Sequence, residues 1–173
     1  MLLHVKRHEN NDLSDLSFDH RQQQPHLQAK TTHLAAQPKQ PKNVTTDTTY
    51  NTHMSERIIK DTEATYEGEI YKGLRHGRGK LTTKDGDIYK GEFDYGNFQG
   101  FGTLKTKEGG EVKGFWNGGV LDGHGNETWA DGSKYNGHYK EGVKCGEGTY
   151  QWKDGTIYHG NWMDDKPNGK VGL

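Results

Sequence analysis

The chain has little of what builds a disulfide framework, a globular core or a membrane span. Cys145 is the only cysteine, so an intrachain disulfide is excluded and a reducing compartment fits. Only 28% of the 173 residues are hydrophobic, which argues against a large core. No apolar stretch approaches the roughly 20 residues of a membrane span, and residues 1–6 are too short for the core of a signal peptide. We therefore expect a cytoplasmic protein.

An excess of one charge is missing as well. The chain has 23 Lys and Arg against 24 Asp and Glu, and the balance stays close to zero on both sides of residue 65. Nucleic-acid binding usually depends on clustered cations, so we expect no nucleic-acid partner. For the same reason, contact with an anionic membrane has only weak support.

Glycine and aromatic residues, by contrast, are abundant and recur in a fixed order every 23 residues. The units of this pattern begin at Tyr66, Tyr89, Val112, Tyr135 and Tyr158, and the last unit is incomplete. Glycine returns at the third, eighth, twelfth, fourteenth and twenty-first positions, and a large apolar or aromatic residue at the fifth. A period of this length indicates a supersecondary unit stacked on copies of itself.

Each unit is predicted to form a β-hairpin. Side chains alternate between the faces of a strand, so positions one, three and five place a ring, a glycine and a ring on one face. The glycines at positions twelve and fourteen repeat this device on the second strand, and we expect neighbouring rings to fill the space they leave. Acidic residues before glycine mark the turns, at Asp85-Gly86, Glu108-Gly109, Asp131-Gly132 and Asp154-Gly155. The predicted fold is all-β, an elongated single antiparallel sheet of about nine strands.

Residues suited to catalysis or metal binding are few. Ser133 is the only serine after residue 65, so a Ser-His-acid arrangement lacks a supported nucleophile. The histidines of the repeat region, at 76, 124, 138 and 159, show no close metal-ligand spacing. Cys145 stands where other units have His76, Gln99 and Asp122, which predicts a variable loop residue. We expect no catalytic residues, no metal and no cofactor, and hence no enzyme.

Composition divides the chain near residue 65. All 25 glycines lie at or after Gly68, whereas three of the four prolines precede it. Residues 1–65 are rich in Gln, Thr and His and have few aromatics, a composition that cannot offset the entropy lost on folding. We therefore predict a disordered N-terminal arm over residues 1–65 and a repeat array over residues 66–173.

Aromatic residues recur along the predicted inner face and admit two interpretations. They hold the sheet together by cross-strand packing, or part of them also forms a groove that binds a partner. The residues in question are Tyr89, Phe93, Trp116, Trp129, Tyr135, Tyr139, Trp152, Tyr158 and Trp162.

The first unit runs Tyr66-x-Gly68-x-Ile70-x-x-Gly73-x-x-His76-Gly77-x-Gly79 and then reaches Asp85-Gly86. This pattern resembles the MORN repeat (membrane occupation and recognition nexus) over about residues 66–170. Departures include Val112 for Tyr, and Asp165 and Val171 for Gly in the last unit. The resemblance implies an elongated sheet of hairpins in scaffolds, cytoskeletal or ciliary assemblies and membrane-contact proteins. It also implies that any catalysis resides in an attached domain.

The leading hypothesis is a non-enzymatic scaffold or adaptor that binds protein, in a cytoskeletal or ciliary setting. The alternatives are a peripheral membrane tether that recognises phospholipid headgroups and a regulatory subunit of a separate kinase or methyltransferase. The fifth unit stops without a following Asp-Gly turn, so its strand is predicted to leave an open edge. We expect self-association through this C-terminal edge.

Overall fold

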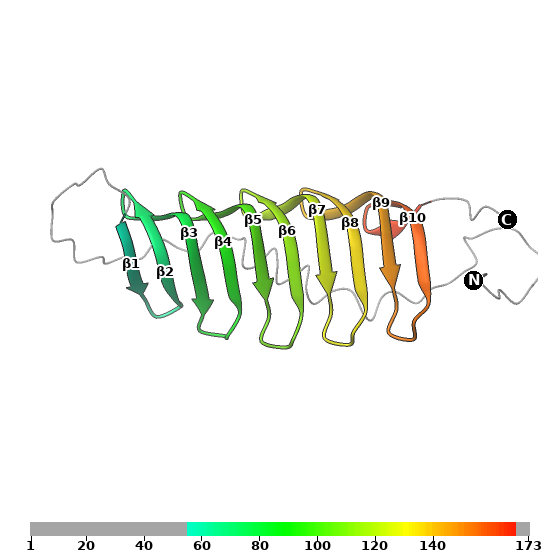
Figure 1. The fold of residues 1–173 in the computed structure, drawn as a ribbon, viewed down its shortest axis with the longest axis horizontal. Coiled ribbons are helices and arrows are strands. Elements are labelled where there is room, and N and C mark those ends of the chain that lie inside the picture. Colours follow the sequence, from blue (N-terminus) through cyan, green and yellow to red (C-terminus); the bar gives the residue numbers. More distant parts are fainter. Residues whose placement is uncertain (1–54, 169–173) are drawn as a thin grey trace, which may run out of the picture.

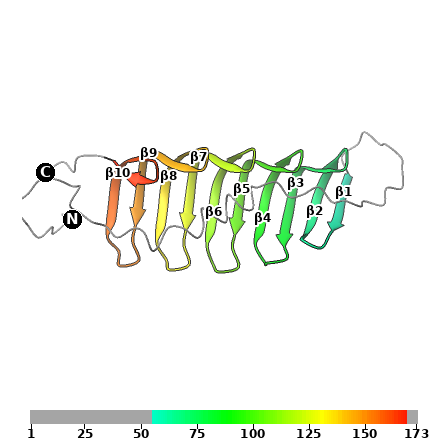
Figure 2. The same cartoon turned by 180° about the vertical axis from the view of Figure 1, so that it is seen from behind.

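The computed structural model describes residues 55–168, which form one antiparallel sheet of eleven strands (Figure 1). The strands pair in chain order, so the sheet is a row of successive hairpins from end to end (Figure 2). They are β1 (Ser55–Lys60), β2 (Ala64–Tyr71), β3 (Leu74–Thr83), β4 (Ile88–Asp94), β5 (Asn97–Lys105), β6 (Glu111–Asn117), β7 (Val120–Thr128), β8 (Lys134–Lys140), β9 (Val143–Gln151), β10 (Ile157–Met163) and β11 (Lys166–Pro167). The predicted all-β class and single antiparallel sheet are confirmed.

The sheet extends beyond the predicted array at its N-terminal end and gains a short strand at the other. β1 precedes the predicted boundary at residue 65 and pairs with β2 along its whole length. β11 pairs only with the last two residues of β10. The sequence analysis missed both strands because β1 lacks the glycine-aromatic pattern and β11 is too short to show one. The rest of the predicted arm, residues 1–54, lies outside the described residues.

Two kinds of turn reverse the chain. Within a unit, two residues with positive φ join the strands, as Lys72 (φ 50°) and Gly73 (φ 78°) do. Both central residues of a type I′ hairpin turn need positive φ, which costs glycine least. Between units, the glycine amide donates to the carbonyl three residues earlier, as at Gly86. Oδ1 of Asp131 and of Asp154 each accepts from an amide two residues on, which confirms the turn role of these two carboxylates.

Every complete unit contains a β-bulge beside its third-position glycine. The pairing register shifts after Gly68 in the first unit and at the equivalent place in the next three. A bulge interrupts the ladder and deprives backbone groups of partners. The first-position tyrosine provides a hydrogen-bond partner for one of these groups: Oη of Tyr66 donates to the carbonyl of Glu69 at 2.7 Å. The same bond recurs at 2.9–3.2 Å from Tyr89, Tyr135 and Tyr158 to the carbonyls of Glu92, His138 and Asn161.

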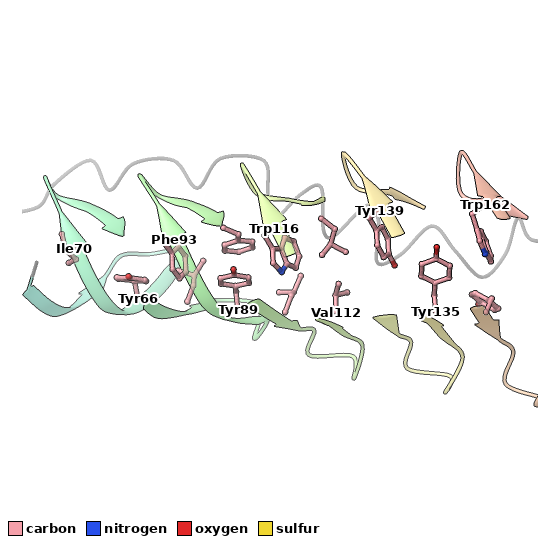
Figure 3. Close-up of a cluster of buried hydrophobic side chains, with 14 residues drawn as sticks. Tyr66, Ile70, Tyr89, Phe93, Val112, Trp116, Tyr135, Tyr139 and Trp162 are labelled. Atoms are coloured by element: carbon pink, nitrogen blue, oxygen red, sulfur yellow. The ribbon is translucent and has the colours of Figure 1, made fainter. Parts of the chain in front are cut away.

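The core is a strip of side chains on one face of the sheet, which we call the inner face. Figure 3 shows first-position side chains pointing toward those at the fifth position in the first four units. Tyr89 illustrates the packing: its ring stacks on Phe98 at 3.6 Å and meets Trp116 edge-on at 5.5 Å. The buried core residues come from four positions of the unit. Position one supplies Tyr66, Tyr89, Val112 and Tyr135, and position five supplies Ile70, Phe93, Trp116, Tyr139 and Trp162. Position ten supplies Phe98 and Leu121, and position sixteen supplies Leu81, Leu104 and Tyr150.

Glycine makes room for these rings at the third and fourteenth positions. A Cβ added to Gly102 would collide with Tyr89 of the neighbouring strand, as predicted, whereas one added to Gly137 would collide with Tyr135 two residues earlier in its own strand. The twelfth position is different. Gly77 and Gly100 have φ of 61° and 60°, and a Cβ there would meet a glutamate carboxylate on the opposite face. The expected ring-space role was wrong at this position, because the bulge turns these glycines away and uses their left-handed backbone instead.

Candidate functional site

The nine aromatic residues predicted to form a partner-binding groove lie on or beside the inner core, and most are covered. Six are at most 4% exposed, namely Tyr89, Phe93, Trp116, Tyr135, Tyr139 and Trp162. Trp129, Trp152 and Tyr158 are partly buried and pack against this core. Only these last three therefore offer substantial ring surface to a partner.

The buried rings also satisfy their own polar groups within the sheet. Nε1 of Trp116 donates to the carbonyl of Gly102, and Nε1 of Trp162 to that of Gly148, both at 3.2 Å. Burial raises the pKa of Tyr66 to about 12 and also raises the pKa of Tyr89, because the charged phenolate would lose its hydration. These groups are thus held as neutral hydrogen-bond donors.

A buried ion pair interrupts the apolar strip between the third and fourth units. Nζ of Lys144 lies 3.1 Å from Oε2 of Glu127, and their side chains are 1% and 4% exposed. Oη of Tyr139 donates to the same Oε2 at 2.9 Å. The ammonium also lies 5.1–5.4 Å from the ring centroids of Trp129, Tyr135 and Tyr139, whose faces attract a cation. A carboxylate and three rings thus replace water around Lys144.

The pair occupies positions that are mostly apolar elsewhere in the array. Glu127 stands at position sixteen, where the other complete units have Leu81, Leu104 and Tyr150. Lys144 stands at position ten, where the second and third units have Phe98 and Leu121 and the first has Arg75. The pair was not predicted from the sequence, because the glycine and ring positions that define the repeat do not include positions ten and sixteen. An alignment of the units against one another would have indicated the pair, because a Glu and a Lys of opposite charge replace mostly apolar residues at two buried positions of adjoining units.

The eleventh position connects neighbouring units. In three junctions a side chain at this position contacts the next unit, through His76 Nδ1 and Asp94 Oδ1 (3.3 Å), Gln99 Oε1 and the Gly118 amide (3.1 Å), and Asp122 Oδ2 and Lys140 Nζ (2.9 Å). Cys145 holds the same position within β9 and is therefore a strand residue, so the loop assignment was wrong. His76, Gln99 and Asp122 thus each make a polar contact with the next unit from the same position.

The opposite face, which we call the outer face, carries side chains that change from unit to unit. Here the bare backbone of Gly79, Gly91 and Gly102 forms the floor of a shallow outer groove. Its sides are Arg78, Lys80, Lys90, Phe101, Thr103 and Lys113, with Glu67 and Glu92. A basic face was not predicted from the sequence, because positive and negative charges cancel over the whole chain. The sheet nevertheless brings four cations from three units into one groove.

The C-terminal edge of the sheet is apolar and partly open. Ile157 and Met163 are 50% and 57% exposed, and the partly buried Trp152 and Tyr158 pack against the adjoining core. β11 covers the end of β10 at Trp162 and Met163 only. Among the described residues, no strand pairs with the rest of that edge.

The hairpin row, the ring-on-glycine packing and the 23-residue spacing are properties of one repeat family. The MORN repeat model matches five consecutive segments, at residues 66–88, 89–111, 113–134, 135–157 and 158–170. The chain belongs to the MORN repeat family. MORN repeats fit a repeat-based role in protein interaction or membrane association. No curated protein matches the chain closely enough to add a relative to this assignment.

Within residues 55–168, no three His, Cys, Asp or Glu side chains converge as ligands for a metal ion. The same part of the chain contains no helix of the length and apolarity needed to cross a membrane.

Proposed function

We propose that this MORN protein is a non-enzymatic scaffold or adaptor that binds other proteins in a cytoskeletal or ciliary assembly of the cytoplasm. The observation that supports this role most directly is the C-terminal edge. There, Ile157 and Met163 are exposed, and the part of β10 before Trp162 has no partner strand on this side among the described residues. An open edge of this kind accepts a strand from another chain. Most inner-face rings are occupied with packing, which leaves the edge and the outer face to bind.

A second copy of the chain is the occupant we favour for the β10 edge. Two β10 strands related by a twofold axis would pair antiparallel, each presenting the same surface to the other. Trp152 and Tyr158 would extend the contact with their exposed ring surface. The chain after β10 protects this edge only as far back as Asn161. β11 (Lys166–Pro167) is two residues long, and the Asn168 amide then donates to the Asn161 carbonyl.

Light scattering on the full chain tests the edge directly. The wild-type protein should be a dimer, and the double variant Ile157→Glu/Met163→Glu should be a monomer, because buried carboxylates oppose apolar pairing. Ile58→Glu is the matched control, since Ile58 is 69% exposed at the other end of the sheet, and it should remain dimeric. A wild-type monomer, or an unchanged dimer in the double variant, contradicts edge pairing.

Proximity labelling with the tagged full chain in its native cell tests the assembly role. Cytoskeletal or ciliary proteins should be enriched over a tag-only control. Flotation of the protein with anionic vesicles in the absence of such neighbours would favour a membrane tether. Co-purification of a kinase or methyltransferase whose activity depends on this chain would favour a regulatory subunit.

A further inference from the structure

The outer groove brings together cations that are far apart in the sequence. Arg78 and Lys80 come from β3, Lys90 from β4 and Lys113 from β6. Lys80 lies 3.7 Å from a carboxylate oxygen of Glu67. Lys90 and Lys113 are exposed, and neither makes an ion pair with another described residue. Two ammonium groups of the groove are therefore free to bind an anion.

The spacing of the two free lysines follows from the register of the sheet. Lys90 in β4 pairs with Thr103 in β5, and Thr103 pairs with Lys113 in β6. Neighbouring strands lie ~4.8 Å apart, so the two lysine backbones are roughly 10 Å apart on one face. The groove thus offers two positive charges at a defined separation along the long axis of the sheet.

An exposed pair of rings lies beside these lysines. Phe101 and Phe115 are 46% and 52% exposed and face each other from β5 and β6. Their centroids are 5.5 Å apart in an edge-to-face arrangement, and Nζ of Lys113 lies 5.6 Å from the Phe101 centroid. Neither ring belongs to the inner core. Exposed rings next to free cations form a mixed apolar and cationic surface of the kind that binds partners.

We propose that the outer groove binds an extended acidic peptide segment of a partner protein. The proposal rests on the scaffold function above and names the chemistry of its partner. Carboxylates three residues apart in a polyproline II segment lie on the same side and are about 9 Å apart, which matches the roughly 10 Å between Lys90 and Lys113. An apolar side chain between the carboxylates reaches Phe101 and Phe115. The backbone at positions 79, 91 and 102 forms the floor on which the segment would lie.

A peptide with separated carboxylates fits this groove better than a continuous polyanion does. Glu67 and Glu92 line the same groove, so a nucleic acid or an anionic membrane would meet two carboxylates as well as the cations. The row of paired outer-face residues that contains Lys90, Thr103 and Lys113 has no lysine beyond Lys113. Its next members across the sheet are Asn126, Asn136 and Thr149, which are neutral. A flat basic surface of membrane dimensions is therefore absent from the described part of this face.

Fluorescence polarisation with a designed probe tests the proposal on the full chain. The probe is a fluorescein-labelled peptide of about four Glu-Leu-Pro repeats, which places a carboxylate every third residue in a polyproline II segment. A matched peptide with Gln for Glu controls for apolar binding. Wild-type protein should bind the Glu peptide, and binding should weaken as salt rises, because screening shortens the reach of the lysines.

Two variants with equal changes in charge assign the binding to the groove. Lys90→Glu/Lys113→Glu should weaken binding by about tenfold or more, since attraction becomes repulsion at both ends of the segment. Lys134→Glu/Lys153→Glu, exposed sites at the end of the third unit and in the fourth, should leave the affinity unchanged. Phe101→Ala should weaken it several-fold. Circular dichroism and melting temperature confirm that each variant is folded before binding is compared.

The outcomes separate the two proposals. Equal binding of the Glu and Gln peptides, or equal loss in both charge variants, overturns the acidic-peptide site. Stronger binding of phosphatidylserine vesicles or of oligothymidine than of the Glu peptide also overturns it. If partners from the proximity-labelling experiment remain bound to Lys90→Glu/Lys113→Glu, the scaffold function stands and the groove is not its binding site.

Discussion

The inner and outer faces of one sheet differ in what repeats. On the inner face the same contact returns from unit to unit, as in the rings of Tyr66, Tyr89 and Tyr135 over the glycines beside them. On the outer face a single row changes from Lys90 to Thr103 to Lys113 to Asn126 across four adjacent strands. The contrast teaches that repetition marks the positions that fold this chain. Departure from repetition marks a specific internal contact at Glu127 and Lys144, and on the outer face it marks the surface that we propose for binding.

The largest effect is expected where the inner face itself departs from the repeat. Lys144→Leu should destabilise the sheet by about 3–5 kcal/mol, because it leaves Glu127 buried without its cation. Lys144→Leu/Glu127→Leu should recover most of this loss. Adding Tyr139→Phe to this double variant should recover further stability, because the Tyr139 hydroxyl has lost its acceptor, Glu127. Urea unfolding measures all three variants, and a single Lys144→Leu variant as stable as wild type would show that the ammonium is not part of the core.

A smaller effect is expected from filling the space over an inner glycine. Gly102→Val should cost about 1–3 kcal/mol, because the new side chain would occupy the place of the Tyr89 ring. The adjacent Thr103 faces the outer side, so Thr103→Val is the matched control and should change stability by less than about 0.5 kcal/mol. Thermal unfolding of the two variants compares the faces within one strand. Equal losses would contradict the assignment of faces.

Alkaline pH should weaken the inner face gradually. The pKa of Tyr66 is raised by burial from 10.0 to about 12 in the folded sheet, and burial also raises the pKa of Tyr89 and Tyr135. The folded state therefore holds these protons more tightly than the unfolded chain. Their contribution to stability is complete below pH 10.0 and is lost as the pH rises toward about 12. Circular dichroism against pH, with tyrosinate absorbance, should show ionisation of these residues together with unfolding, and ionisation in an intact sheet would contradict this.

The smallest effect on stability is expected on the outer face, and it sharpens the comparison most. Lys90→Glu/Lys113→Glu should change the free energy of unfolding by less than about 0.5 kcal/mol, because both side chains are exposed. Urea unfolding of this variant, set beside its peptide affinity, separates folding from binding. A loss of stability as large as that of Gly102→Val would show that the outer lysines also hold the sheet together.

The repeat period made most of the fold predictable. Tyr66, Gly68 and Asp85-Gly86 each have one structural use, so their recurrence predicts strands, ring space and turns. Twelfth-position glycines such as Gly77 were misread because strict alternation does not anticipate a bulge. β1 was missed because it lacks the glycine-aromatic pattern of the other strands, although it pairs with β2 and its Ile59 packs against the core.

The candidate sites were harder to predict because they depend on neighbours across units. Phe98 and Leu121 are core residues at position ten, but no glycine or invariant ring marks that column. Lys90 and Lys113 lie 23 residues apart, at the second position of adjacent units, so the repeat places them on one face; the register of β4, β5 and β6 adds Thr103 between them. The total charge of the chain concealed this local excess.

The ion pair of Glu127 and Lys144 also affects how the array can misassemble. A chain of near-identical hairpins can pair one unit out of place or exchange units with a second copy. Shifted by one unit, Lys144 would face the position of Leu104, and its charge would be buried without a carboxylate. The pair thus specifies which unit follows which. Refolding of Lys144→Leu/Glu127→Leu should accordingly show more slow phases than wild type, because slipped pairings no longer carry this electrostatic penalty.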